Sequence, residues 1–246
     1  MSGGEAEWIE RHRSVWNAKP ALREYYRREI FDRIFQHVGT GPTLEVGAGP
    51  GFLAEYRRCD VVSDLTASIG IDVCADVQRL PFASDTFGAA VGVDILHHIA
   101  KPALALQEIE RTLKPGGRLV LVEPWTGSLS VAFFKLVHHE HCEVVPDPWM
   151  HAFGDGKNAM DGNTRLSRLV LHDRATELSR YVPALTVLHT EPFGSLSCLL
   201  TGGFQDWSAP AAVIRGLCAA EDWLPRSVLS AVGVRALFVL EKSVER

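Results

Sequence analysis

The spacing of the apolar residues changes near residue 43, and this change separates a helical segment from an alternating one. Between residues 5 and 38, apolar side chains such as Leu22 and Tyr25 recur three or four positions apart, which is the spacing of one helix face. Pro20 predicts a break between two helices, and the sequence GTGP at 39–42 predicts the end of the second. We therefore expect an N-terminal helical region that acts as a lid.

From residue 43 to residue 124, short apolar runs alternate with helical patterns. The strand-like runs are almost continuously apolar, which is typical of parallel strands buried on both faces. The predicted strands are 43–46, 60–63, 71–74, 88–93 and 118–123, and the predicted helices are 51–58 and 103–113. The sequence KPGG at 114–117 predicts a glycine cap and a proline stop for the second helix. This alternation predicts an α/β fold with a doubly wound, mostly parallel sheet.

After Pro124 the regular pattern stops. Residues 125–165 are rich in aromatic, His, Asp, Asn and Gly residues, which suggests a substrate-binding insertion after the fifth strand. The later part predicts a helix at 166–180, strands near 185–189 and 195–200, a helical region at 209–230 and a last strand at 235–240. Late strands of this kind suit an antiparallel edge. We expect a single domain, 1–246, made of a helical lid (1–40), a cofactor-binding core (41–124), a substrate insertion (125–180) and C-terminal strands and helix (181–246).

The sequence TLEVGAGPGF at 43–52 joins the first predicted strand to the first helix through alternating glycines. Gly47, Gly49 and Gly51 give G-x-G-x-G, whereas the dinucleotide fingerprint G-x-G-x-x-G needs its third glycine at the position of Phe52. Such a turn brings backbone amides against a ligand at the helix start. Glu45 lies inside the apolar strand, so its carboxylate needs partners, either loop amides or a ligand ammonium. Taken alone, an ordinary glycine turn with a structural Glu explains these residues equally well.

Two aspartates follow the next predicted strands. Asp64 ends the second strand, where a carboxylate can accept both ribose hydroxyls of a nucleoside. Asp76 ends the third strand, where it can accept a hydrogen bond from an adenine amino group. Each aspartate alone is also compatible with an ordinary turn or helix cap.

Together these segments resemble the class I S-adenosylmethionine-dependent methyltransferases, in the small-molecule branch often called type 11. The resemblance covers about residues 42–124 and rests on LEVGAGPG, DVQRLPFASDTF, VDILHHIAKP and ERTLKPGGRLVLVEP. It implies a Rossmann-like, seven-stranded sheet with an antiparallel last strand and S-adenosylmethionine as cofactor. It also implies ribose contacts for Asp64, adenine contacts for Asp76 and Val77, and a methionine-binding role for Gly47 and Gly49.

The full set of candidate cofactor-binding residues is Tyr25, Glu45, Gly47, Ala48, Gly49, Gly51, Asp64, Leu65, Asp76, Val77, Asp94 and His98. Tyr25 is included because aromatic rings of an N-terminal lid can cover a sulfonium through cation–π contact, although core packing is the stronger alternative. The sequence departs from the family after Asp64, where only LTASIG precedes the third predicted strand. We expect a short or absent helix there, and a more open adenine pocket.

The candidates for chemistry are His97, His139 and Glu140. A general base is needed only when the acceptor must lose a proton, because the donor methyl group is already activated. His139 and Glu140 belong to HHEHCE at 138–143, which offers many metal ligands but is not H-E-x-x-H. We expect one or two of these side chains to face the acceptor and expect no metal; a solvated helix end is the plain alternative.

Composition narrows the function further. The 246 residues carry a net charge of −5, which argues against a nucleic-acid partner. The five cysteines contain no C-x-x-C pair, and no secretory signal or apolar stretch of membrane-spanning length is visible, so we expect a cytoplasmic protein. The prediction is a monomeric or homodimeric methyltransferase acting on oxygen or nitrogen of a small secondary metabolite or lipophilic intermediate. The rival hypotheses are a nicotinamide-dependent oxidoreductase and a sulfonium-binding protein that transfers no methyl group.

Overall fold

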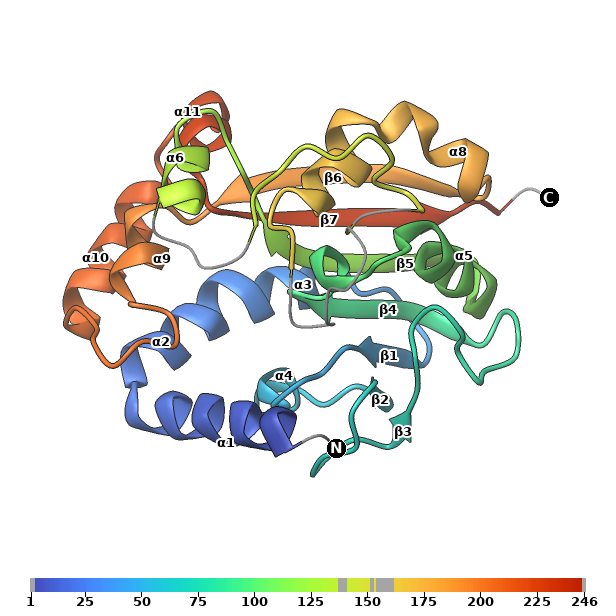
Figure 1. Ribbon diagram of the computed structural model, residues 1–246, viewed down its shortest axis with the longest axis horizontal. Helices are drawn as coiled ribbons and strands as arrows, with labels where there is room; N and C mark the ends of the chain where they lie inside the picture. The colour runs from blue at the N-terminus through green and yellow to red at the C-terminus, as the bar shows by residue number, and fades with distance from the viewer. Residues whose placement is uncertain (1–2, 137–140, 151–152, 154–161, 245–246) are drawn as a thin grey trace.

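The protein is built on one seven-stranded sheet (Figure 1). The computed structural model describes residues 3–136, 141–150, 153 and 162–244. The strand order is β3-β2-β1-β4-β5-β7-β6. The strands are β1 Thr43–Val46, β2 Val61–Asp64, β3 Val73–Cys74, β4 Phe87–Val93, β5 Leu113–Pro124, β6 Leu185–Phe193 and β7 Arg235–Lys242. Strands β1 to β5 pair in parallel, and β7 is antiparallel to both β5 and β6, which confirms the predicted sheet.

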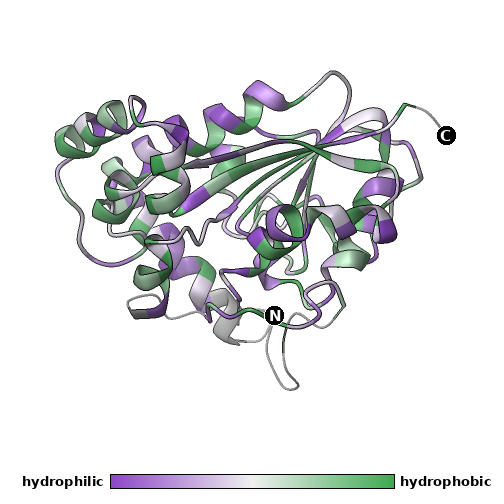
Figure 2. Ribbon diagram, turned by 90° about the horizontal axis from the view of Figure 1, so that it is seen from above, coloured by the Kyte–Doolittle hydropathy of each residue, from purple (hydrophilic) through white to green (hydrophobic). Residues whose placement is uncertain are grey.

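Helices cover both faces of this sheet. The N-terminal layer consists of α1 Gly3–Ala18, α2 Pro20–Tyr25, the π-helical segment Tyr26–Phe31 and α3 Asp32–His37. The remaining helical segments in the core half are α4 Phe52–Tyr56, the 3-10 turn Leu96–His98 and α5 Pro102–Thr112. The later ones are α6 Ser130–Leu136, α7 Leu166–Arg168, the π segment Leu169–Asp173, the 3-10 turn Ala175–Glu177, α8 Leu178–Tyr181, α9 Leu196–Leu200, α10 Ala211–Glu221 and α11 Arg226–Val232. Figure 2 shows apolar colour along the central strands and polar colour over much of the outer helices.

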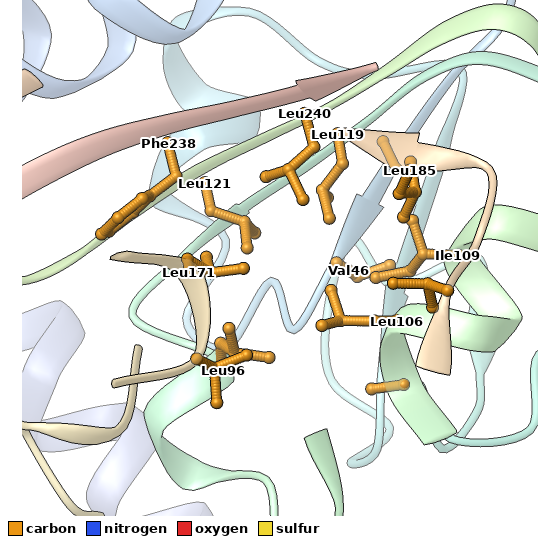
Figure 3. Packing of buried hydrophobic residues seen from close by; sticks show 14 of the residues in the cluster. Val46, Leu96, Leu106, Ile109, Leu119, Leu121, Leu171, Leu185, Phe238 and Leu240 are labelled. Atoms are coloured by element: carbon orange, nitrogen blue, oxygen red, sulfur yellow. The ribbon is translucent and has the colours of Figure 1, made fainter. Parts of the chain in front are cut away.

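The two sides of the central strands belong to two different cores. Leu119 and Leu121 of β5 pack with Leu106 and Ile109 of α5, as Figure 3 shows. Val120 lies in the opposite cluster, together with the N-terminal helices. Because successive side chains of a strand point to opposite faces, burial on both faces requires the continuous apolar run RLVLVE.

Two sequence-based expectations were wrong. The KPGG sequence does not cap α5, because the helix ends at Thr112 and β5 begins at Leu113. Its glycines lie in the strand, where the register against β4 shifts between Phe87 and Ala89. The run at 195–200 forms the helix α9 rather than a strand. An apolar run this short has no decisive period, so its contacts with the surrounding helices select its structure.

The connection between β2 and β3 contains no helix, as expected from its length. Turns and bends lead from Asp64 to the two-residue strand β3, and Leu65 and Ile69 project into solvent, with 57% and 93% of their surface exposed. The sheet edge beside the predicted adenine pocket is therefore open.

The N-terminal layer packs directly against the glycine loop. The Trp16 ring stacks on Phe52 at 4.2 Å between centroids, and the Arg13 guanidinium donates to the Pro50 carbonyl at 2.5 Å. Among the residues that the structure describes, no helix is both long enough and apolar enough to cross a bilayer.

Candidate cofactor site

The glycine loop after β1 has one crowded and one open position. Gly47 and Gly49 both have left-handed backbone, with φ of 64° and 51°. A Cβ at Gly47 would lie 2.3 Å from the Ile95 side chain, so the close packing of that turn requires glycine. A Cβ at Gly49 would meet nothing within 4 Å. The Gly49 face therefore looks onto open space, which suits the close approach of a ligand.

Asp64 fixes this loop from the end of the neighbouring strand. Its Oδ2 accepts a hydrogen bond from the Gly49 amide at 2.8 Å, and its Oδ1 accepts one from the Thr66 amide at 2.8 Å. The carboxylate is only partly buried, so it also remains accessible to a ligand above the loop. Ala48 and Gly51 complete the turn, because the Ala48 amide donates to Ser63 at 3.1 Å and the Gly51 amide donates to Ala48 at 2.9 Å.

Asp76 and Val77 lie beyond the β2–β3 edge and differ in exposure. Asp76 is exposed and accepts hydrogen bonds from the Gln78 amide at 2.9 Å and from its side-chain nitrogen at 3.2 Å. Val77 is buried at 8% exposure. An exposed carboxylate next to an apolar residue is a suitable arrangement for an adenine, and Leu65 adds an exposed apolar side chain on the same edge.

Glu45 is a buried carboxyl group with an oxygen that has no hydrogen-bond partner. Only 4% of this residue is exposed, and its Oε2 has no hydrogen-bond partner. Burial raises the pKa of Glu45 from its ordinary value of 4.5 to about 7, while Arg58 opposes the shift and Asp64 adds to it. A buried carboxylate with an orphaned oxygen beneath the loop fits the need for a cationic or hydrogen-bond-donating partner.

Asp94 directly follows β4 and has an unusual backbone conformation. Its φ is 54°, which is uncommon for a residue with a side chain. Its carboxylate accepts a hydrogen bond from Arg235 at 2.5 Å, and the Arg235 guanidinium lies 5.8 Å from the centre of the Tyr26 ring. The pair joins the carboxyl end of β4 to the first residue of β7. Tyr25 is 1% exposed and packs beside Tyr26, at 6.3 Å between ring centroids.

His97 and Glu123 form a buried, hydrogen-bonded pair behind this edge. Glu123, at the end of β5, is fully buried and accepts hydrogen bonds from the Ile95 amide at 2.9 Å, the Leu96 amide at 2.7 Å and Ser167 at 2.9 Å. His97 Nδ1 lies 2.7 Å from the same carboxylate. Burial alone would raise the pKa of Glu123, but His97 and the other donors hold it below its ordinary value.

The structure thus brings Glu45, Gly47, Gly49, Asp64 and Asp94 to one edge of the sheet. His98 is half-buried and its ring lies 4.1 Å from that of His97. His139 and Glu140 lie outside the described residues. The sequence reasoning missed two residues, Arg235 and Glu123. Glu123 carried a signal, since an acid at the end of an apolar strand needs partners, whereas nothing local identified Arg235.

Residues 44–121 match the family described as the methyltransferase domain. The matched segment contains β1, the glycine loop, Asp64, Asp76 and the β4 turn with Asp94 and His97. Less than half of the chain is matched, and the segments after residue 121, including most of the predicted substrate insertion, lie outside it.

Two relatives are demethylmenaquinone methyltransferase from Paenarthrobacter aurescens and the ubiquinone/menaquinone biosynthesis C-methyltransferase UbiE from Desulfotalea psychrophila. The first is 34% identical over 113 residues, which cover 40% of this chain and 44% of that protein. The second is 33% identical over 104 residues, which cover 35% and 42% of the two chains. The chain therefore matches less than half of the length of these curated relatives.

Solved structures extend the similarity to the whole fold. A Haloferax volcanii methyltransferase in complex with the methyltransferase activator Trm112 matches with a TM-score of 0.52, at 16% identity, over 98% of this chain and 96% of that chain. An S-adenosylmethionine-dependent methyltransferase from Thermotoga maritima matches with a TM-score of 0.50, at 15% identity, over 89% and 95% of the two chains. These similarities establish a Rossmann-like methyltransferase fold.

Proposed function

We propose that this chain, whose residues 44–121 belong to the methyltransferase domain family, transfers a methyl group from S-adenosylmethionine to a small-molecule acceptor. One observation carries the proposal. The Gly49 backbone faces open space and its amide donates to the Asp64 carboxylate at 2.8 Å, while the buried Glu45 of the preceding strand has one carboxylate oxygen without a hydrogen-bond partner. This combination suits a nucleoside that carries a positive charge and no phosphate.

Different residues of the site would contact different parts of the cofactor. Asp64 would accept the ribose hydroxyls, and Asp76 and Val77 would flank the adenine at the open sheet edge. The loop from Gly47 to Gly51, including Ala48, would hold the methionine part, with Glu45 offsetting its ammonium charge. Leu65, Asp94, His98 and Tyr25 are retained as proposed contacts of the same cofactor.

The bound sulfonium supplies an activated methyl group, so the chain mainly has to orient the acceptor and exclude water. Asp94 is supported as a cofactor contact by its position directly after β4, where its carboxylate is held by Arg235. We assign His97 as a positioning residue, because its 2% exposure and its contact with Glu123 favour holding the 95–98 turn over exchanging a proton with solvent. His139 and Glu140 remain proposed bases.

The acceptor is proposed to be a small molecule with an apolar part, such as a secondary metabolite or lipophilic intermediate. The names of the relatives, which refer to menaquinone and ubiquinone biosynthesis, support a small acceptor. One of these names specifies carbon as the methylated atom, so oxygen, nitrogen and carbon should all be included in the product analysis.

Label transfer tests the proposal. Purified protein would be mixed with methyl-labelled S-adenosylmethionine and a small-molecule extract, and the products separated by polarity. We expect a labelled small molecule with the wild-type protein and none with Asp64→Ala. Tight S-adenosylhomocysteine binding without any labelled product would favour the sulfonium-binding alternative. Binding of NAD in place of S-adenosylhomocysteine would support the oxidoreductase alternative and refute the proposal.

A further inference from the structure

A cavity of about 640 Å³ lies between residues of three segments that follow β5 in the chain. Its described lining comes from the end of α6, from the segment 141–144 and from Arg165. Asn163 connects it to the β4 turn, because the Asn163 amide donates to the His97 carbonyl at 2.9 Å. Phe134 and Cys142 of the lining pack against Val234, the residue before Arg235. The lining residues of the cavity are therefore linked to the 95–98 turn and to the start of β7.

The charged lining of this cavity has an excess of positive charge. The Arg165 side chain is half-buried, and its Nε is fully buried without a hydrogen-bond partner. Within the described part of the chain, neither Arg165 nor Lys135 forms an ion pair with a carboxylate. Glu143 is the single acid among the described lining residues, and its side chain is 68% exposed and 4.0 Å from His141.

Arg165 differs in this respect from other half-buried arginines. Arg33 contacts Glu29 at 2.8 Å, Arg111 contacts Glu108 at 2.8 Å, and Arg168 contacts Asp173 at 3.1 Å. A buried N–H group that loses water without gaining an acceptor is costly, and in Arg165 this applies to the Nε–H. Its backbone is nevertheless fixed, since the Arg165 amide donates to Asn163 at 3.2 Å directly before α7. A guanidinium held at a cavity wall in this way is suited to pair with an anionic ligand.

The rest of the lining is apolar. Phe134 and Cys142 are 5% and 7% exposed, and Val144 adds a third apolar side chain at 58% exposure. A ligand that uses the whole cavity therefore needs an apolar body as well as a negatively charged group.

We propose that this cavity is the acceptor site and that it selects a small molecule with an anionic group on an apolar body, bound through Arg165. The proposal rests on the proposed methyltransferase function and specifies its acceptor class. Lys135, an exposed residue of the lining, adds a second positive charge, and the apolar body lies against Phe134 and Cys142.

A pair of fluorescent probes tests the charge requirement directly. 8-Anilinonaphthalene-1-sulfonate and N-phenyl-1-naphthylamine share an aromatic framework, and only the first carries a sulfonate. We expect the wild-type protein to bind the sulfonate probe at one site. Arg165→Gln should weaken its affinity about tenfold or more, because a hydrogen bond to a charged group is lost. The affinity for the uncharged probe should not change.

Control variants separate charge from folding. Arg165→Lys should retain most of the affinity for the sulfonate probe, and Lys135→Gln should weaken it less than Arg165→Gln does. Arg27→Gln removes an exposed arginine from the N-terminal layer and should change neither affinity. Thermal melting of each variant reports on the fold.

The proposal is overturned if the sulfonate probe does not bind, if Arg165→Gln leaves its affinity unchanged, or if this variant weakens both probes equally. Calorimetry with S-adenosylhomocysteine on the same samples keeps the two proposals apart. Normal S-adenosylhomocysteine affinity together with any of these outcomes would remove the acceptor assignment alone. Failure of the wild-type protein to bind S-adenosylhomocysteine would remove the methyltransferase proposal itself.

Discussion

Replacing Glu45 by Gln should stabilise the protein in a way that depends on pH. Burial raises the pKa of this carboxyl from 4.5 to about 7, so the folded state binds its proton more tightly than the unfolded state does. Below pH 4.5 the carboxyl is protonated in both states and has little effect on the free energy of unfolding. Between pH 4.5 and 7 its ionisation lowers the free energy of unfolding by about 1.4 kcal/mol for each pH unit, and above pH 7 the total loss reaches about 3 kcal/mol. Glu45→Gln removes this penalty, because an amide does not ionise.

Urea unfolding at pH 5 and pH 8 measures the effect. We expect the gain from Glu45→Gln to be larger at pH 8 than at pH 5 by about 2 kcal/mol. Glu10→Gln removes the same charge from an exposed position and should change stability by no more than about 0.5 kcal/mol at either pH. If Glu45→Gln changes the free energy of unfolding by the same amount at pH 5 and pH 8, the assignment of a buried carboxylate with a raised pKa is refuted. Because this carboxylate is also proposed to offset the cofactor ammonium, the stabilised variant should bind S-adenosylhomocysteine more weakly.

Five further outcomes are expected. Asp64→Ala should weaken S-adenosylhomocysteine binding about tenfold or more by calorimetry, since charged hydrogen bonds are lost, while circular dichroism stays unchanged. Gly49→Ala should likewise reduce that affinity while lowering the free energy of unfolding by only about 1–2 kcal/mol, because the added methyl meets no protein atom but the backbone is left-handed. Glu123→Gln should destabilise the protein by about 3–5 kcal/mol in urea, because it breaks the buried pair with His97. Since the pKa of Glu123 is depressed, wild-type stability from this pair is present above pH 4.5 and should fall as acid titration continues below it. Dialysis against a chelator should leave methyl transfer unchanged; loss of activity that zinc restores would contradict this expectation.

Local signals predicted the cofactor half of the molecule well. The predicted strand 43–46 coincides with β1, because the glycine loop fixes where the apolar run must end. The glycine loop, the aspartate at the end of the second strand and the missing helix after it are each visible in a short stretch of sequence, so a sequence displays them directly.

Long-range pairing decided the features that the sequence did not reveal. Arg235 lies 141 residues from Asp94, and only the antiparallel placement of β7 brings the two together. The KPGG residues lie at an irregularity of β5, between Leu113, which pairs with Phe87, and Arg118, which pairs with Ala89. The helix α9 forms through its surroundings rather than its own pattern. Arg165 is distinctive only by the absence of a partner in the described structure, which no sequence pattern encodes.

The position of β7 determines the order in which the sheet can be completed during synthesis. β6 hydrogen-bonds to β7 alone among the described strands, and β7 follows it in the chain. On the ribosome, the parallel half from β1 to β5 can pair as soon as it emerges, while β6 has no partner strand until residues up to Lys242 are available. Such delayed, non-local pairing is slow and leaves an edge open to wrong partners. The nascent chain would therefore form the parallel half, from β1 to β5, first and complete the opposite edge of the sheet only after β7 has been made.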